Sequence, residues 1–158
     1  MVMHMAQLAL NLLEPRARDE AQAPGWIAVV GHDGSAATAS LLAHAVRRVG
    51  PDGYLIVVHA LPLGVSAADA ESGREYADVA RGVLRSIEAA LPEGIPHETR
   101  IVAGPASKAL LEAARRCAAD EIVLGASSGR AARGAIGRVA DTVLRHSELP
   151  VTIVPRGA

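Results

Sequence analysis

Short apolar runs alternate with amphipathic stretches along most of this chain. The continuous apolar runs from Trp26 to Val30 and from Tyr54 to Ala60 predict strands that are covered on both faces. The segment from His97 to Val102 alternates polar and apolar residues, which predicts an edge strand with one face in water. Two shorter apolar runs, Glu121 to Leu124 and Val151 to Val154, complete a set of five predicted strands.

Apolar residues at helical spacing predict a helix after each of the first four strands. The first helix follows Ser35 and stops before Gly50, and the second runs roughly from Arg74 to Leu91. The third begins at Pro105, and the fourth spans about Gly137 to Ser147. Such alternation of strand and helix is typical of a parallel sheet with right-handed crossovers. We therefore predict an α/β fold with a doubly wound, five-stranded parallel sheet and helices on both faces.

The length of 158 residues suits one domain, which we place at residues 25–158. Residues 1–24 form an N-terminal extension in this interpretation. Its apolar run before Pro15 predicts a short helix that packs on the body or on a partner, and a polar tether follows. The run is too short for a membrane span and lacks the basic start of a secretion signal, so we expect a cytoplasmic protein without a membrane partner.

Composition narrows the classes of function. Half of the residues are hydrophobic, yet there is no Phe, one Trp and two Tyr, so the core must consist of Ala, Val, Leu and Ile. The net charge is −1, and few aromatic rings are available to stack on bases, which argues against nucleic acid as a partner. The single cysteine, Cys117, falls on the apolar face of a predicted helix and is expected to be an inert thiol. Six histidines show no metal-ligand spacing, and we predict no metal site.

The most informative stretch runs from Leu124 to His146. A strand leads into a glycine-rich loop that carries Arg130, Arg133 and Arg138 and no acidic residue, and then into an amphipathic helix. Glycines let the backbone approach a ligand closely, and the first amides of a helix are unpaired donors at the positive end of its dipole. This pattern favours an anion site, and phosphate is the expected guest. The same residues would also suit an ordinary connection with solvated arginines.

A second loop, Gly31 to Ser35, follows the first predicted strand. Ligands of doubly wound sheets lie beyond the carboxyl ends of the strands, where the strand order reverses. If strands one and four are neighbours at that point, the two loops face each other across one crevice. This convergence favours a binding site over an ordinary connection.

Three side chains near this crevice have alternative interpretations. Asp33 precedes Gly-Ser and could cap the following helix, contact a ligand, or do both. Ser35 lacks the glycine elbow of a serine nucleophile, and no His and Asp partners can be assigned to it. His59 is interpreted as a packed histidine at a strand end rather than as a base. We therefore predict no catalytic residue.

Four segments together resemble the universal stress protein family. They read IAVVGHDGSAAT at the first turn, VVHA at the end of the second strand, IVAGPASKALLEAARRCAADEIVLGASSG from the third strand into the glycine-rich loop, and GRVADTVLRHSELPVTIVP near the C-terminus. The resemblance covers Trp26 to Pro155. It implies a Rossmann-like fold with strand order 3-2-1-4-5. It also implies a homodimer, which would pair through the edge strand Val151 to Val154. In one branch of the family the ligand is an adenine nucleotide, with ATP most expected, and Mg²⁺ would enter only with ATP.

The nucleotide loop departs from the family's pattern of glycine, two residues, glycine, nine residues, glycine and then Ser or Thr. Eleven residues separate Gly125 from Gly137, where the pattern has twelve, and Arg138 replaces the hydroxyl residue. Arg138 would bind phosphate by charge or fill the pocket instead. Carried over position by position, the resemblance implies ten binding residues: Gly31, Asp33, Ala60, Leu124, Gly125, Ser128, Gly129, Gly137, Arg138 and Val139.

The leading hypothesis from the sequence is a regulatory dimer that binds an adenine nucleotide without catalysis. A slow ATP hydrolase is the enzymatic alternative. A structural or chaperone-like stress protein with an empty, degenerate site is the third.

Overall fold

Nine helices and strands make up the part of the chain that the computed structural model describes, which is residues 25–61, 70–126 and 136–155. In chain order they are β1 (Ile27–His32), α2 (Thr38–Val49), β2 (Tyr54–Leu61), α3 (Ala70–Ala90), β3 (His97–Ala103), α4 (Ala106–Arg116), β4 (Glu121–Gly125), α5 (Arg138–His146) and β5 (Val151–Val154). Every strand and helix predicted for these residues is present. The expected extension, residues 1–24, lies outside the described residues.

All five strands belong to one parallel sheet with the order β3-β2-β1-β4-β5. The predicted fold and strand order are therefore confirmed. β3 is an edge strand, as its alternation of polar and apolar residues predicted, and β5 forms the opposite edge. The chain adds β2 and β3 on one side of β1, and then β4 and β5 on the other side. The strand order therefore reverses at the carboxyl ends of β1 and β4.

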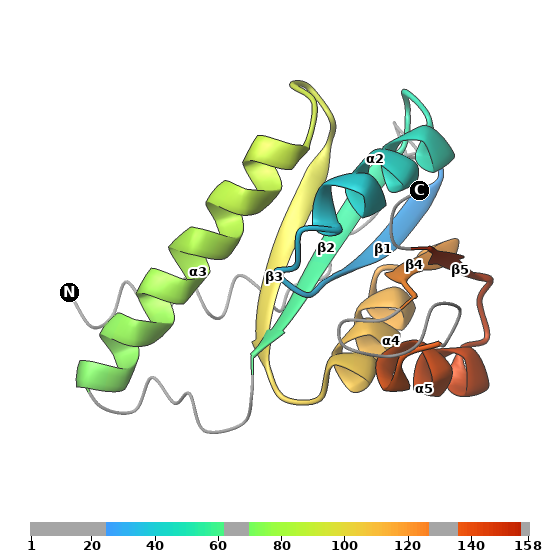
Figure 1. Ribbon diagram of the computed structural model, residues 1–158. Coiled ribbons are helices and arrows are strands. Elements are labelled where there is room, and N and C mark those ends of the chain that lie inside the picture. The colour runs from blue at the N-terminus through green and yellow to red at the C-terminus, as the bar shows by residue number, and fades with distance from the viewer. Residues whose placement is uncertain (1–24, 62–69, 127–135, 156–158) are drawn as a thin grey trace.

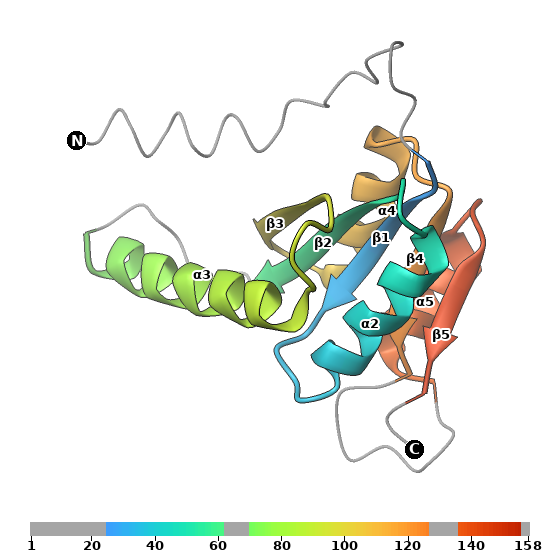
Figure 2. The same ribbon diagram turned by 90° about the horizontal axis from the view of Figure 1, so that it is seen from above.

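Helices cover both faces of the sheet, with α2 and α3 on one face and α4 and α5 on the other (Figures 1 and 2). Two core clusters fill these layers. The cluster beneath α4 and α5 includes Val29, Leu110 and Val143, and the cluster beneath α2 and α3 includes Val30, Leu42 and Ile87. Small aliphatic side chains of this kind allow helices to pack closely on a sheet, which is how a chain without Phe fills its core.

The adjacent strands β1 and β2 extend further at their carboxyl ends than the sequence pattern predicted. β1 continues through Gly31 and His32, which we expected in the turn, and β2 continues to Leu61. The reason is tertiary: β2 lies alongside β1 to the end, so that Gly31 pairs with Val58 and His32 pairs with His59. Neighbouring backbone thus extends a strand that local sequence would end.

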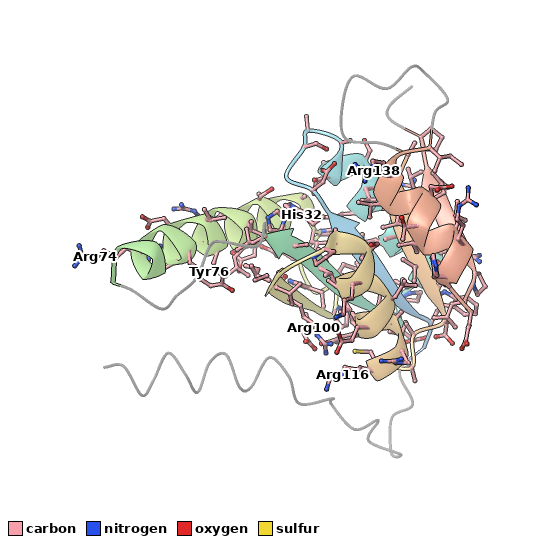
Figure 3. All side chains as sticks on the ribbon, turned by 90° about the horizontal axis from the view of Figure 1, so that it is seen from below. His32, Arg74, Tyr76, Arg100, Arg116 and Arg138 are labelled. Atoms are coloured by element: carbon pink, nitrogen blue, oxygen red, sulfur yellow. The ribbon has the colours of Figure 1, made fainter. Side chains whose placement is uncertain are left out.

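Helix α3 also begins earlier than predicted, at Ala70 instead of Arg74. Its C-terminal half is anchored by Val83 and Ile87, which are buried on the sheet. The N-terminal half extends beyond β3, and Arg74 lies near its outer end (Figures 2 and 3). None of the helices in the described ranges is long and apolar enough to cross a membrane.

Candidate functional site

A cavity of about 450 Å³ lies beyond the carboxyl ends of β1 and β4, where the strand order reverses. Both loops singled out in the sequence border it. Of the ten residues predicted to bind a ligand, eight line this cavity: Gly31, Asp33, Ala60, Leu124, Gly125, Gly137, Arg138 and Val139. The other two, Ser128 and Gly129, lie outside the described residues, as do Arg130 and Arg133. The predicted crevice is therefore a single cavity.

Sequence reasoning missed most of the apolar wall of this cavity. The wall includes Leu41 from α2, Val58 from β2 and Leu110 from α4, together with Val154 at the end of β5 and Pro155 after it. These residues belong to helical and strand patterns that also fill the core, so periodicity alone cannot separate a lining residue from a packed one. An apolar wall with a few polar groups at its rim is typical of a small-molecule site.

Gly31 keeps the floor of the cavity open. A Cβ atom at this position would lie 2.5 Å from Leu124 Cδ2 and 3.4 Å from Leu110 Cδ2. Both leucines line the cavity. A side chain at position 31 would therefore push them into the space that a ligand needs.

The N-terminus of α5 forms one side of the cavity. Gly137 precedes the helix in an extended conformation, and its N–H donates to Ala126 O at 2.6 Å. The first helical hydrogen bond runs from Asp141 N–H to Gly137 O, so the amides of Arg138, Val139 and Ala140 precede the helical ladder. Unpaired amides at the positive end of a helix favour an anion. Arg138 is the first residue of the helix, it is exposed, and it adds a positive charge at the same point (Figure 3).

Asp33 stands on the other loop. Its Oδ1 accepts a hydrogen bond from Ser35 N–H at 2.9 Å, and Gly34 between them has a φ of 76°. The helix itself begins only at Thr38, its N-cap is Ala37, and no side chain caps it. The interpretation of Asp33 as the helix cap is therefore wrong, because the carboxylate closes the preceding turn. That bond uses one carboxylate oxygen at the rim of the cavity.

Ser35 carries no sign of nucleophilic activation. Its Oγ is buried and has no hydrogen-bond partner among the residues that the structure describes. A serine nucleophile needs a base within hydrogen-bond reach. Within the same residues, no group of three or more His, Cys, Asp or Glu side chains could hold a metal ion.

Cys117 follows α4 and is half-buried against the core cluster beneath that helix. Burial raises the pKa of its thiol, and the nearby Arg100 guanidinium opposes this effect without cancelling it. A thiol whose pKa is raised forms less of the reactive thiolate. This agrees with the prediction of an inert cysteine.

His59 lies at the end of β2, as the sequence suggested, and contacts a histidine that the sequence analysis did not single out. Its Nδ1 lies 2.9 Å from His32 Nδ1 and 3.0 Å from His32 O. The two rings meet edge to face, with centroids 5.0 Å apart. Burial first, and His59 second, lower the pKa of His32, while Asp33 acts in the opposite direction. The only sequence signal for this pair was a histidine at the end of each of two adjacent strands.

Comparison with known proteins places these features in a family. The model of the universal stress protein family matches residues 27–155. The chain belongs to the universal stress protein family. No curated protein matches it. Universal stress proteins are also among the similar solved structures.

Three solved structures illustrate this similarity. A hypothetical protein whose biochemical function was assigned from its structure has a TM-score of 0.70 at 17% identity, covering 85% of this chain and 99% of its own. A universal stress protein in complex with cAMP has a TM-score of 0.60 at 28% identity, with the same coverage of 85% and 99%. A universal stress protein from Archaeoglobus fulgidus in complex with dAMP has a TM-score of 0.55 at 21% identity, covering 82% of this chain and 98% of its own. Adenine nucleotides are thus ligands of some proteins with this fold.

Proposed function

We propose that this universal stress protein is a regulatory protein that binds an adenine nucleotide in the cavity between β1 and β4, without catalysing a reaction. One observation carries the proposal. The apolar cavity has an anion-favouring helix N-terminus with Arg138 on one side and the Asp33 carboxylate on the other. An adenine nucleotide has the matching parts: a flat apolar base, a ribose with hydroxyl donors and a phosphate.

The related complex with cAMP supports this ligand class, because that protein is 28% identical to this chain over most of its length. ATP remains the adenine nucleotide that the family resemblance favours. If ATP binds, its phosphates would carry Mg²⁺ into the site. A released-phosphate assay separates simple binding from slow hydrolysis: steady turnover that the Asp33→Ala variant loses would refute the non-catalytic part of the proposal.

The first test concerns the two rim residues. Arg138→Ala is expected to weaken ATP binding by about tenfold, since a charge-assisted hydrogen bond contributes roughly 1.5 kcal/mol or more. Adenosine, which has no phosphate, should lose little affinity. Asp33→Ala should weaken both ligands, because a carboxylate at the other rim would contact the nucleoside. Titration calorimetry measures all four affinities.

Arg116→Ala is the matched control. Arg116 is also exposed but lies on α4, well away from Arg138 (Figure 3). This variant should bind both ligands like the wild type. If Arg138→Ala leaves ATP affinity unchanged or improves it, Arg138 fills the pocket instead of binding phosphate, and the proposal of a functional phosphate site is wrong.

We also propose that the protein is a homodimer that pairs through β5. This strand is the edge of the sheet beyond β4, and all four of its residues, Val151 to Val154, are only half-buried. An apolar edge strand is open to pairing with another chain. Sedimentation at micromolar concentration should give twice the mass of one chain, and a monomer would contradict the proposal. A variant that lacks residues 1–13 tests whether the N-terminal extension adds to this interface.

A further inference from the structure

Two histidines meet at the carboxyl ends of the adjacent strands β1 and β2. His32 is the last residue of β1, and His59 pairs with it in the sheet register. Alternation along β1 puts the His32 side chain on the same face as Ala28 and Val30, beneath α2 and α3. His32 is 5% exposed, so the contact lies within the protein.

Hydrogen-bonding chemistry assigns the protons of this pair. A carbonyl oxygen can only accept, so His59 Nδ1, at 3.0 Å from His32 O, must carry a proton. The same N–H faces His32 Nδ1 at 2.9 Å, which must then be the acceptor. In its neutral form His32 therefore carries its proton on Nε2, a buried atom with no hydrogen-bond partner among the described residues. The arrangement is consistent only while His32 is neutral.

The pair is directly connected to the rim of the nucleotide cavity. His32 itself lines the cavity, and so do Asp33, which follows it, and Ala60, which follows His59. The bond from His59 to the His32 carbonyl therefore joins the two strand ends immediately before they reach the site. It fixes the backbone from which the Asp33 turn starts.

We propose that His32 and His59 are positioning residues of the nucleotide site, and that they hold Asp33 in its binding position only while His32 is uncharged. The inference rests on the proposed function. It adds control by protons to that site: nucleotide affinity should fall as the solution becomes acidic.

Protonation of His32 would disrupt this arrangement. A proton on His32 Nδ1 would face the proton on His59 Nδ1 across 2.9 Å, so either the two rings separate or His59 moves its proton to Nε2. In both cases His59 Nδ1 no longer donates to His32 O. The resulting imidazolium would attract the adjacent Asp33 carboxylate, whose charge already acts on His32. Both changes would draw Asp33 away from a ligand.

On α2 and α3, the charged side chains that the structure describes are exposed, and two other titratable groups are half-buried. α2 carries the half-buried His44, and α3 carries Tyr76, whose hydroxyl donates to Ile101 O on β3. The charges that act on His32 are those of His59 and Asp33. Burial and His59 lower the pKa of His32, so the change in affinity is expected below about pH 6.5.

The experiment measures cAMP affinity by calorimetry from about pH 7.5 to about pH 5. The phosphodiester of cAMP keeps one negative charge over this range, so a change in affinity reports on the protein. For the wild type we expect affinity to fall at least about threefold, and by no more than about tenfold per pH unit, because one proton is linked to binding. In parallel, NMR titration of the His32 ring should show a lower pKa with cAMP bound than without it.

Two substitutions at His59 separate positioning from simple packing. His59→Asn keeps a donor near Nδ1, and its amide can turn to present an acceptor when His32 is protonated, so binding should stay near wild type and lose its pH dependence. His59→Leu removes the bond at every pH, and binding should already be weaker at about pH 7.5. His44→Asn is the control and should keep the wild-type profile.

The outcomes are distinct. Absence of both cAMP and ATP binding to the wild type near neutral pH would refute the proposed function, and this inference with it. Wild-type binding that does not change with pH would overturn the inference alone. Equal pH dependence in the wild type and in His59→Asn would do the same, and this result does not depend on whether His59→Leu folds.

Discussion

A buried ion pair at the amino end of the sheet gives the sharpest test of how this fold is stabilised. The Glu121 side chain is fully buried at the start of β4, and its Oε2 accepts from Arg48 Nε at 3.1 Å and from Thr152 Oγ1 at 3.4 Å. Its Oε1 has no partner among the described residues. Arg48→Met would therefore leave a buried carboxylate with one weak hydrogen bond.

The magnitude follows from the burial of the two partners. Removing one member of a fully buried pair costs about 3–5 kcal/mol, whereas an exposed pair contributes about 1 kcal/mol or less. The Arg48 side chain is 51% exposed, so water partly screens the pair and we expect an intermediate value. We predict that Arg48→Met lowers the free energy of unfolding by about 2 kcal/mol, which corresponds to roughly 4–8 °C in Tm for a domain of this size.

The assay is urea denaturation followed by circular dichroism, with Arg47→Met as the matched control. Both arginines lie in the last turn of α2, so both variants lose the same favourable interaction with the helix dipole. Arg48 also lies over the Trp26 ring, 5.4 Å from its centroid. We therefore repeat Arg48→Met in a Glu121→Gln background, in which there is no ion pair. Arg48→Met removes the contact with the Trp26 ring in both backgrounds, so the difference between its two effects isolates the ion pair.

We expect Arg48→Met to cost clearly more in the wild-type background than in Glu121→Gln. If Arg48→Met costs no more than Arg47→Met, the carboxylate of Glu121 does not depend on Arg48. The assignment of a stabilising pair between α2 and β4 would then be wrong.

Two further predictions concern His32 and two glycines. The pKa of His32 is lower in the folded protein than its ordinary value of about 6.5. Below about pH 6.5 the unfolded chain therefore binds more protons at this residue than the folded protein does. The stability that depends on neutral His32 is complete above that pH and is lost as the pH falls through the lower folded pKa. The urea midpoint should therefore decrease from pH 7.5 to pH 5 by more in the wild type than in His32→Val, and parallel decreases would contradict this. Gly34 has a φ of 76° in the turn that holds Asp33, so Gly34→Ala should destabilise by about 1–2 kcal/mol. Gly82 lies in the interior of α3 with open space around it, so Gly82→Ala should instead stabilise the protein by up to about 1 kcal/mol. Thermal unfolding measures both variants, and equal effects of the two substitutions would refute the conformational explanation.

The amino-acid sequence by itself determined the fold of this protein to a large extent. The run before Pro92 repeats apolar residues at helical spacing, and the run from Tyr54 is continuously apolar, so each element could be assigned from its own residues. Alternation of five strands with four helices permits few arrangements besides a parallel sheet. The glycine and arginine residues around α5 also marked one side of the site, because an anion-favouring helix start depends on local sequence.

Only the tertiary structure decided how the site is assembled. The apolar wall formed by Leu41, Val58 and Leu110 comes from three separate elements, and each residue fits an ordinary core pattern in its own segment. The role of Asp33 changed from helix cap to turn residue because α2 starts three residues beyond Ser35. Such an offset depends on how the helix packs on the sheet.

The histidine pair shows the same limit most clearly. His32 and His59 are 27 residues apart in the chain, and their contact exists because β1 and β2 pair in parallel and in register to their last residues. A slip of one residue would turn one of the two side chains to the opposite face of the sheet. Sequence supplies the two imidazoles, but the register of the sheet brings their nitrogens together, because backbone pairing between distant segments is a property of the folded chain.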